Sequence, residues 1–404
     1  MQATLERPTR TSRRIAQVPA TTGFWLLVVA LFTLTFAAAA PSPLYVVYQS
    51  RWGFSALTLT LIFAVYAFAL LAALLTVGGI SDHLGRRPVL AAGLLLDAAS
   101  MLVFLSARSV AWLIGARIVQ GLATGVLLGT FSAGLVDLQP RHRPQLAALL
   151  NSVVSTVGLA AGALGTGLLV QYAPAPTTLV YAVLAVGFVV MAAAIGVLPE
   201  TAPRRPGAVA SLRPRVAVPR VVRGHFLAAV PSLVATWALG GLYLSLGPSL
   251  AASVLHLRSH VIGGLIVAVL TGFGAAASVA VRDRHPRRVA VGGSLVLAAG
   301  VVLTLVALGT LSAVLLFAGT AVAGLGFGAA FFGAFRTLAQ QAPAEQRGDL
   351  FAAVFVVSYL AFSLPAIAAG LFVPEVGLRD TAVGYGVGVL VLALSATALR
   401  LRAG

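Results

Sequence analysis

Two charged side chains, Asp97 and Arg117, lie inside long apolar stretches of the sequence. If these stretches cross a membrane, an arginine inside one costs at least ~2.5 kcal/mol and should face a cavity or a partner. Burial opposes the ionisation of a carboxyl group and a nearby arginine favours it, so the two groups together could bind and release a proton. The alternative is a static buried ion pair that holds two helices together.

The depths of these two residues predict that their side chains meet. Arg117 lies about seven residues, or ~10 Å, from one end of its stretch, and Asp97 lies about eight residues, or ~12 Å, from the opposite side. Across a hydrocarbon core of ~30 Å this leaves ~8 Å between neighbouring antiparallel helices, which two side chains can bridge. Since no other acid lies well inside an apolar stretch, we predict that Asp97 and Arg117 carry proton coupling.

The composition favours a chain embedded in a membrane. Of its 404 residues, 59% are hydrophobic and only 9% are charged, whereas a soluble domain carries about 25% charged residues. The basic residues are all arginine, and they recur in small groups between apolar runs rather than in one patch. The net charge of +17 therefore does not predict nucleic-acid binding.

The residue types that the chain lacks exclude several kinds of chemistry. Without cysteine there are no disulfides, thiolate metal sites or cysteine nucleophiles. Without lysine there is no phosphate-binding loop of the form G-x-x-x-x-G-K-[ST], so this chain cannot drive transport with ATP. No grouping of acids and histidines suggests a metal site. We expect no enzyme activity, no metal and no cofactor.

Twelve stretches are long and apolar enough to form membrane-spanning helices, each of which needs ~20 residues. Apolar residues cover nearly all faces of these stretches, as expected for helices surrounded by lipid and by other helices. The sequence therefore predicts an all-α polytopic membrane protein. The stretches are roughly 22–47, 55–80, 89–106, 110–136, 145–172, 177–198, 226–252, 261–281, 289–308, 311–337, 349–373 and 381–399.

The arginines predict which ends of these helices face the cytoplasm. With the N-terminus inside, 22 arginines fall in cytoplasmic segments and four fall outside, namely Arg51, Arg108, Arg258 and Arg379. Cytoplasmic loops carry such an excess, so we expect a protein of the cell membrane with both termini in the cytoplasm. The expected organisation is a tail at 1–21, a six-helix bundle at 22–198, a basic linker at 199–225 and a second six-helix bundle at 226–404.

The two halves of the chain look like copies of one another. Short motifs recur in the same order, at offsets between 201 and 207 residues. Such an ordered series predicts two pseudo-symmetric parallel repeats with a substrate path at their interface, near mid-membrane. The matching sets are Ala40-Pro41-Ser42 with Gly247-Pro248-Ser249, Asp82, Arg86 and Arg87 with Asp283, Arg287 and Arg288, and Gly121 and Gly125 with Gly324 and Gly328.

The segment 78–90, between the second and third stretches, reads Gly-Gly-Ile-Ser-Asp-His-Leu-Gly-Arg-Arg-Pro-Val-Leu. Its glycines allow a tight reversal and close helix approach, and its acid can pair with the arginines. An ordinary basic loop would explain the arginines but not the acid and the glycines at these spacings. The residues expected to form a conformational gate are Gly78, Asp82, Gly85, Arg86 and Arg87.

This segment resembles the signature loop G-x-L-a-D-x-x-G-R-R/K of the major facilitator superfamily, with a degenerate second copy at 282–288. The resemblance extends to the twelve spans, the central basic loop and the duplicated halves. It implies a transporter with the major facilitator fold whose two bundles rock about a central site. It also implies that Asp82 latches the first half to the second in the outward-facing state, and that the protein works as a monomer.

The run Arg117-Ile118-Val119-Gln120-Gly121 resembles the R-x-x-Q-G motif of proton-coupled exporters in the superfamily, where the arginine is tied to proton transfer. Gln120 and Gly121 therefore join the expected gate. The run 162–167 resembles a worn form of the antiporter motif, although glycines at this spacing also simply allow close packing. One departure is that the first span has no acid, which many related drug exporters carry.

A set of polar and aromatic residues is expected to line the substrate cavity. Prolines in the first span free backbone carbonyls that can face water, and the other members add polar edges to apolar walls. Such a lining suits an amphipathic or aromatic solute better than a sugar, which needs many more hydrogen-bonding groups. The expected cavity residues are Pro41, Tyr45, Asn151, Trp237, Tyr243 and Ser249.

Together these features predict a secondary transporter that exports a small apolar or amphipathic compound, a drug or secondary metabolite, in exchange for protons. Its partners would be that small molecule, protons and the lipid bilayer, with no nucleic acid. Two alternatives stay open: an importer that takes up a metabolite with protons, and a membrane receptor or scaffold that transports nothing. The intramembrane Asp97 and Arg117 count against the scaffold, because such charges are costly to keep without use.

Overall fold

A computed structural model of the chain describes residues 18–143, 145–257, 259–343 and 346–402. The described residues are almost entirely helical and contain no strand. Most of the predicted tail, residues 1–17, lies outside this part of the chain, as does Arg258. The first half contains α1 (Ala20–Ala39), α2 (Pro41–Trp52), α3 (Ala56–Val77), α4 (Ser81–Leu84), α5 (Arg86–Leu105), α6 (Val110–Leu138), α7 (Leu146–Tyr172) and α8 (Leu179–Ile195).

The second half follows a linker that carries the short helix α9 (Ala208–Ser211) and a 3-10 turn (Arg220–Val222). Between α11 and α12, Leu250–Val254 forms a short π-helix. The helices of this half are α10 (Arg223–Ser245), α11 (Gly247–Ser249), α12 (His260–Ala280), α13 (Pro286–Thr310), α14 (Ala313–Gln341) and α15 (Arg347–Arg402).

The predicted count of twelve spans agrees with these helices once two irregularities are included. Ten helical segments in the described residues are long and apolar enough to cross a membrane, and α8 is a shorter apolar helix. The long α15 contains the last two predicted spans, which are separated only by Gly377 with φ 83° and ψ 162°. The expected loop at 374–380 is therefore a single kink, and Arg379 bonds from there to the carbonyl oxygen of Leu308, 2.9 Å away.

Proline explains why two predicted spans are broken helices. The stretch 22–47 is divided between α1 and α2, with Pro41 at the first position of α2. The stretch 226–252 is divided in the same way, with Pro248 in α11 after the end of α10. A proline lacks the N–H that a helix interior requires. The matched positions in the two halves therefore produce matched breaks.

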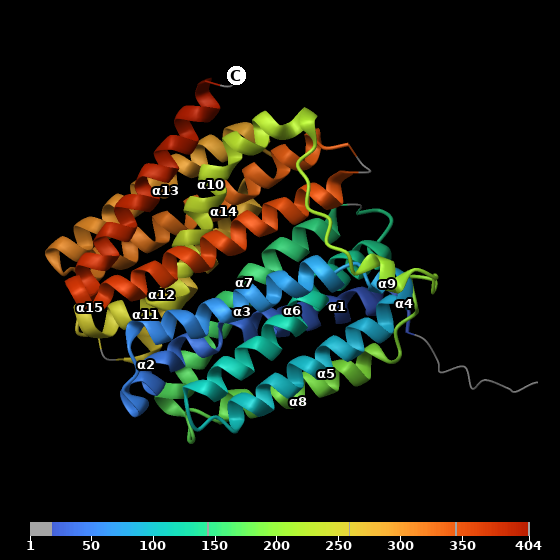
Figure 1. Cartoon of the computed structure of the whole chain (residues 1–404), viewed down its shortest axis with the longest axis horizontal. Coiled ribbons are helices and arrows are strands. Elements are labelled where there is room, and N and C mark those ends of the chain that lie inside the picture. The colour runs from blue at the N-terminus through green and yellow to red at the C-terminus, as the bar shows by residue number, and fades with distance from the viewer. Residues whose placement is uncertain (1–17, 144, 258, 344–345, 403–404) are drawn as a thin grey trace, which may run out of the picture.

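The helices form two bundles that lie side by side (Figure 1). One bundle holds α1 to α8 and the other holds α10 to α15, and the linker passes between them at one end of the molecule. We call this the linker end; it also holds α4 and the start of α1. The opposite end, which holds α2 and α11, we call the far end.

Glycine positions show that the repeat suggested by the sequence is also a repeat of packing. In the first half, a methyl group on Gly121 or Gly125 of α6 would collide with the backbone of α3. In the second half, Gly324 and Gly328 of α14 meet the backbone of α12 in the same way. Each glycine pair lets two helices approach closely. The role of Gly121 seen here is thus close packing against α3.

The two bundles contact each other directly at the far end. Ser42 donates from Oγ to the carbonyl oxygen of Leu244, 2.5 Å away, and the backbone N–H of His260 donates to Oε1 of Gln171 at 3.0 Å. At mid-depth an apolar seam joins α3 to α15, with Tyr66 and Leu70 packed in one cluster with Tyr359. At the linker end, the ion pairs among the described residues stay within one half.

Candidate functional site

The site begins with Arg117, which α6 holds in the interior with a side chain only 1% exposed. Its Nε donates to the hydroxyl oxygen of Tyr45 at 2.7 Å. Its Nη1 donates to Oε1 of Gln120 at 2.7 Å and to the carbonyl oxygen of Ala38 at 3.2 Å. The motif residues Arg117 and Gln120 and the predicted cavity residue Tyr45 thus form one hydrogen-bonded group.

The break between α1 and α2 creates the acceptors of this group. In an unbroken helix the carbonyl of Ala37 would accept from the N–H of residue 41, but Pro41 has none. The side-chain nitrogen of Gln120 fills that place and donates to the Ala37 oxygen at 3.0 Å. Pro41 therefore leaves the carbonyl oxygen of Ala37 without its helical partner, as the sequence suggested. That oxygen accepts from Gln120 and does not face a water-filled cavity.

Two aromatic rings complete the surroundings of the guanidinium group. The Cζ atom of Arg117 lies 5.5 Å from the ring centroid of Tyr45 and 5.0 Å from that of Tyr66. No carboxylate within the described residues forms an ion pair with Arg117. The positive charge is therefore held by neutral oxygens and aromatic faces, an arrangement that stabilises a cation less than an ion pair does.

Asp97 lies on α5 and its side chain is fully buried. Its Oδ1 accepts from the hydroxyl of Ser100 at 2.9 Å, while Oδ2 has no hydrogen-bond partner among the described residues. The predicted contact between Asp97 and Arg117 is wrong for this conformation, because no ion pair joins them.

The helix register explains why Asp97 and Arg117 stay apart. A methyl group on Gly93 of α5 would lie 2.7 Å from the side chain of Leu127 on α6, so these two positions face each other. Counting along the antiparallel helices puts Asp97 about six residues, or ~9 Å, from the level of Arg117. This axial distance between Asp97 and Arg117 is close to the ~8 Å estimated from the sequence. The side chain of Arg117, however, extends toward α1 and α2, where it bonds to Ala38 and Tyr45, and not toward α5.

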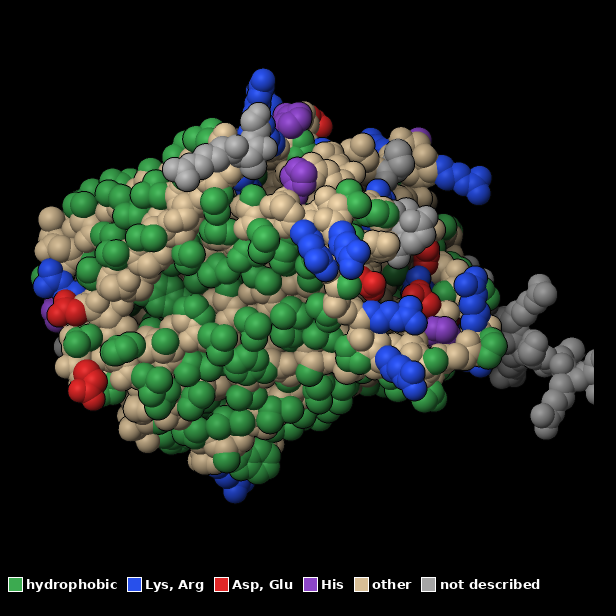
Figure 2. Space-filling model, turned by 45° about the horizontal axis from the view of Figure 1, so that its top comes forward, with side chains coloured by type: hydrophobic (Ala, Val, Ile, Leu, Met, Phe, Trp, Pro, Cys, Tyr) green, Lys and Arg blue, Asp and Glu red, His purple; other side chains and the backbone are tan. Residues whose placement is uncertain are grey.

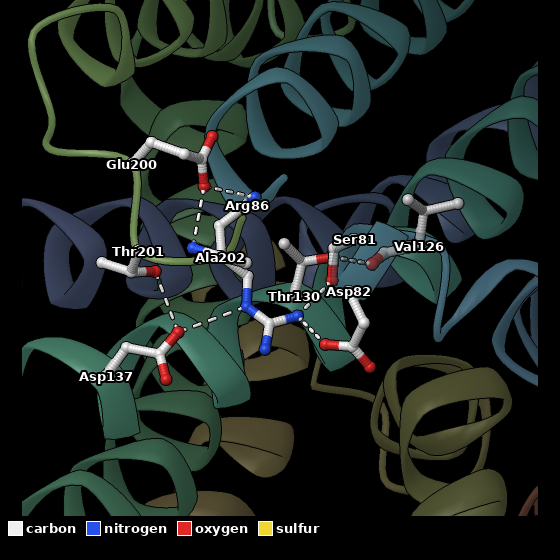
Figure 3. Close-up of polar contacts among 9 residues, drawn as sticks. All are labelled: Ser81, Asp82, Arg86, Val126, Thr130, Asp137, Glu200, Thr201 and Ala202. Carbon is white, nitrogen blue, oxygen red and sulfur yellow. Dashed lines mark hydrogen bonds and ion pairs between the residues drawn. The ribbon is translucent and has the colours of Figure 1, made fainter. Parts of the chain in front are cut away.

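The predicted gate forms a second polar group at the linker end (Figure 3). Arg86 bonds through Nη1 to the carboxylate of Asp82 and to Oγ of Ser81, the latter at 2.7 Å. Its Nε donates to Oδ2 of Asp137 on α6 at 3.3 Å. Arg87 lies beside it and donates to the carbonyl oxygen of Leu198, 3.4 Å away. The gate residues therefore connect the start of α5 to the ends of α6 and α8.

Glu200 completes this group, although the sequence did not single it out. Its carboxylate accepts from the backbone N–H of Arg86 at 2.7 Å (Figure 3). It also accepts from the backbone N–H of Arg87 at 3.2 Å, and so caps the start of α5. An acid at a helix N-terminus is stabilising. The only sequence signal was its place directly after the apolar stretch that ends near Leu198.

Two glycines of the gate, Gly85 and Gly78, occupy positions where the structure favours glycine for different reasons. Gly85 has φ +97°, and a methyl group there would lie 2.7 Å from Oε2 of Glu200. Glycine adopts such backbone without strain. Gly78 has ordinary helical backbone, but its carbonyl oxygen would lie 3.0 Å from a methyl group on Gly129 of α6. Gly78 and Gly129 thus mark a close approach between α6 and the end of α3.

The other predicted cavity residues do not form one lining. Trp237 lies at the seam between the bundles, half-buried, with its ring centroid 4.9 Å from that of Tyr359. Asn151 lies on α7 with Oδ1 3.2 Å from Oγ of Ser132. Tyr243 is buried inside the second bundle and bonds to Thr320. Oγ of Ser249, near the far end, is buried and has no hydrogen-bond partner among the described residues. Of these four, Trp237 is the one that packs with Tyr66 and Tyr359 at the seam.

Comparison with known proteins agrees with this architecture. The family described as Major Facilitator Superfamily matches residues 26–366. The chain belongs to this superfamily. It is accordingly a multi-pass membrane transporter rather than an enzyme, built from twelve spans in two pseudo-symmetric six-span bundles.

Among curated proteins, the chain is similar to two proteins named multidrug resistance protein MdtL. It is 28% identical to that of Klebsiella pneumoniae over 176 residues, 43% of each chain. It is 31% identical to that of Escherichia coli O9:H4 (strain HS) over 170 residues, 42% of each chain. Each similarity thus spans less than half the length of the relative.

Solved structures share the fold at low sequence identity. A bacterial homologue of the human lysosomal transporter Spinster superposes with a TM-score of 0.73 at 14% identity, covering 95% of this chain and 97% of that one. The human organic anion transporter MFSD10 superposes with a TM-score of 0.68 at 17% identity, covering 94% of this chain and all of the other. These similarities establish the fold of this superfamily member.

Proposed function

We propose that this transporter exports small amphipathic compounds in exchange for protons, by alternating access between its two bundles. The observation that carries the proposal is a pair of unmatched groups deep in the first bundle. Asp97 has a buried carboxyl oxygen without a hydrogen-bond partner among the described residues, and Arg117 has a buried guanidinium group without an acid. Arg117 could donate a hydrogen bond to the free oxygen of Asp97, and Asp97 could supply the negative charge that Arg117 lacks.

The protonation of Asp97 follows from the cost of an unpaired charge. Removing an ion from water costs several kcal/mol unless a partner compensates for the loss. Since Oδ2 of Asp97 has no such partner in this conformation, we take the carboxyl group to be neutral and to carry the proton. Movement of Arg117 toward α5, or entry of water, would stabilise the ionised form and release that proton.

The orientation of the protein follows from its arginines. Arginine side chains gather at the linker end, whereas an apolar surface covers most of the molecule between its ends (Figure 2). The far end has few of them among the described residues, namely Arg51, Arg108 and Arg379. By the positive-inside rule the linker end is cytoplasmic. The chain lies in the cell membrane with its described ends on the cytoplasmic side.

The conformation described here is then open toward the cytoplasm. The hydrogen bonds that join the bundles, Ser42 to Leu244 and His260 to Gln171, close the far end. Asp82 is largely exposed at the linker end, and its one ion pair among the described residues is with Arg86 of its own half. In the opposite conformation Asp82 would contact the second half and latch the cytoplasmic side shut.

One transport cycle can be written from these groups. The compound enters from the cytoplasmic side and binds at the seam, where Tyr66 lies between Arg117 and the rings of the second bundle. Displacement of Tyr66 frees Arg117 to approach Asp97, which then loses its proton to the cytoplasm. The bundles rock, the compound leaves outside, and Asp97 takes up a proton there. Each chain contains this whole path, so a monomer suffices.

Everted membrane vesicles from cells that make the protein test this proposal. Energised vesicles should accumulate a fluorescent amphipathic dye faster than vesicles without the protein, and an uncoupler should abolish the difference. Accumulation that persists with the uncoupler would contradict proton coupling. Dye uptake in right-side-out vesicles only would indicate an importer instead.

A further inference from the structure

A group of aromatic rings lies at the seam between the bundles, and one of them, Tyr66, is also the ring beneath Arg117. We call Tyr66, Trp237, Phe331, Tyr359 and Phe362 the seam rings. Trp237 lies at their centre, with ring centroids of Phe331, Tyr359 and Phe362 at 5.7, 4.9 and 5.7 Å. All three pairs are close to edge-to-face, which suits the charge distribution of aromatic rings.

The seam rings combine buried and accessible members. Tyr66 and Tyr359 are nearly buried, whereas Trp237, Phe331 and Phe362 are each half-buried. Trp237 and Phe362 pack in one cluster with residues of the first bundle, including Tyr66 on α3, so the accessible ring surface lies where the bundles meet. This surface could stack on an aromatic ring of a bound compound.

The charges near the seam rings are of one sign. Tyr66 is both a seam ring and the ring beneath Arg117, whose Cζ lies 5.0 Å from its centroid. Arg117 has no acid partner, and the one acid nearby on α5, Asp97, lacks a partner for one of its oxygens. The apolar stretches of the sequence hold no other acid at this depth. With Asp97 protonated, as proposed above, the field at the seam is positive in this conformation.

We propose that the seam rings bind aromatic compounds that carry no positive charge, either neutral or anionic, and that this transporter excludes lipophilic cations. The proposal rests on the proposed export function, because it names the substrate class of the same path. It assigns binding to Trp237, Phe331 and Phe362, and charge selection to Arg117.

Aromatic cages can also attract cations, so the two effects must be weighed. The cation attraction of Tyr66 and Tyr45 is already used by Arg117. A second unit charge roughly 10 Å from Arg117, at an effective dielectric of about 20, would bind roughly tenfold less tightly than an uncharged analogue. Asp97, the acid nearby on α5, does not offset this loss while it carries the proton assigned to it above. Because Trp237, Phe331 and Phe362 are partly exposed, their attraction for a cation is that of an accessible ring, which is weaker than this repulsion.

Two pairs of fluorescent probes of matched skeleton test the proposal on the purified full-length protein in lipid nanodiscs. N-phenyl-1-naphthylamine is neutral and 8-anilino-1-naphthalenesulfonate is anionic. Diphenylhexatriene is neutral, and its trimethylammonium derivative carries a fixed positive charge. Replacing Trp25, Trp52 and Trp112 by Phe leaves Trp237 as the single tryptophan, so energy transfer from it reports binding at the seam.

A matched variant corrects for probes that merely dissolve in the lipid. It keeps Trp112, which is 44% exposed, as its only tryptophan and has Trp237→Phe. We expect transfer from Trp237 that saturates with both naphthalene probes and with diphenylhexatriene. The trimethylammonium derivative should bind at least tenfold more weakly than diphenylhexatriene, and transfer from Trp112 should not saturate with any probe.

Gln120→Glu supplies a second measurement, since it puts a carboxylate where Oε1 now accepts from Arg117 at 2.7 Å. Binding of the cationic probe should then approach that of its neutral analogue, while Gln120→Ala should not help it. Cation binding as tight as neutral binding in the unaltered site, or no saturable transfer from Trp237 at all, would overturn the proposal. Binding needs no proton gradient, so a failure of proton-driven export is seen separately in the vesicle assay.

Discussion

The side-chain nitrogen of Gln120 donates to the carbonyl oxygen of Ala37, 3.0 Å away, in the place where a backbone N–H is missing at Pro41. The same amide accepts from Arg117 at 2.7 Å through Oε1. One side chain therefore ties the break between α1 and α2 to the buried charge on α6. This is a physical reason for a glutamine three residues after the arginine, since both are on one face of the helix.

Gln120→Leu should destabilise the protein. The substitution leaves the Ala37 carbonyl and one Arg117 N–H buried without partners, and such groups cost about 1–3 kcal/mol each. We expect a lower midpoint of thermal unfolding in detergent than for the unaltered protein. Thr130→Val is the control, because the buried hydroxyl of Thr130 on the same helix donates to the carbonyl oxygen of Val126, one turn before it. Equal midpoints for the two variants would contradict the role given to Gln120.

Asp97→Asn should abolish the response of transport to a proton gradient. An amide fills nearly the same volume but cannot release a proton, so the cycle would lack its exchangeable group. The measurement is dye accumulation in energised everted vesicles at matched protein levels. Ser100→Ala removes only the hydroxyl that bonds Oδ1 at 2.9 Å, and it should keep coupled transport. Proton-driven transport retained by Asp97→Asn would rule out Asp97 as the proton carrier.

The sequence predicted most of the fold because the bilayer constrains it strongly. Twelve apolar stretches and the two matched prolines follow from helix length and from the missing N–H of proline. Between the stretches 349–373 and 381–399 the sequence predicts a loop that contains Glu375, Arg379 and Asp380, where the structure has only a kink at Gly377. Their charges sit at the far end of the bundle, where polar side chains suit a helix turn as well as a loop.

The site was predicted less well, because contacts between distant segments leave little trace in one sequence. The depths of Asp97 and Arg117 could be counted, but the direction of Arg117 depends on the acceptors that Pro41 frees. Glu200 lies more than a hundred residues from the helix start that it caps. Nothing in the sequence distinguishes Tyr66 from the other residues of its apolar stretch. Its contact with Arg117 follows from the packing of α6 against α3.

Gly85→Ala should destabilise the turn before α5 through two effects. The backbone there has φ 97° and ψ 150°, a region that is essentially restricted to glycine and costs another residue roughly 1–3 kcal/mol. The new methyl group would also lie 2.7 Å from Oε2 of Glu200 and displace the carboxylate that caps α5. We expect a lower unfolding midpoint, with Gly79→Ala as the control because its methyl group would meet nothing within 4 Å.

The double variant Gly85→Ala with Glu200→Ala separates the two effects. If the methyl group acts partly by displacing the carboxylate, removing Glu200 as well should cost less than the sum of the single changes. Coupled residues in contact depart from additivity in this way. Strictly additive shifts in the midpoint would show that Gly85 matters only for its backbone conformation.

Gly264→Ala should open the far end. A methyl group on Gly264 of α12 would collide with the carbonyl oxygen of Ala163 on α7, so the two bundles could not keep their present approach. Gly272→Ala, about two turns further along the same helix, is the matched control, since its methyl group would meet Ala160 at an ordinary 4.0 Å.

The chain has no cysteine, so spin labels attach only where cysteines are introduced. Labels at Ser109→Cys and Leu311→Cys, one on each half at the far end, should move apart in Gly264→Ala and keep their distance in Gly272→Ala. A distance unchanged by Gly264→Ala would mean that this contact does not hold the far end closed.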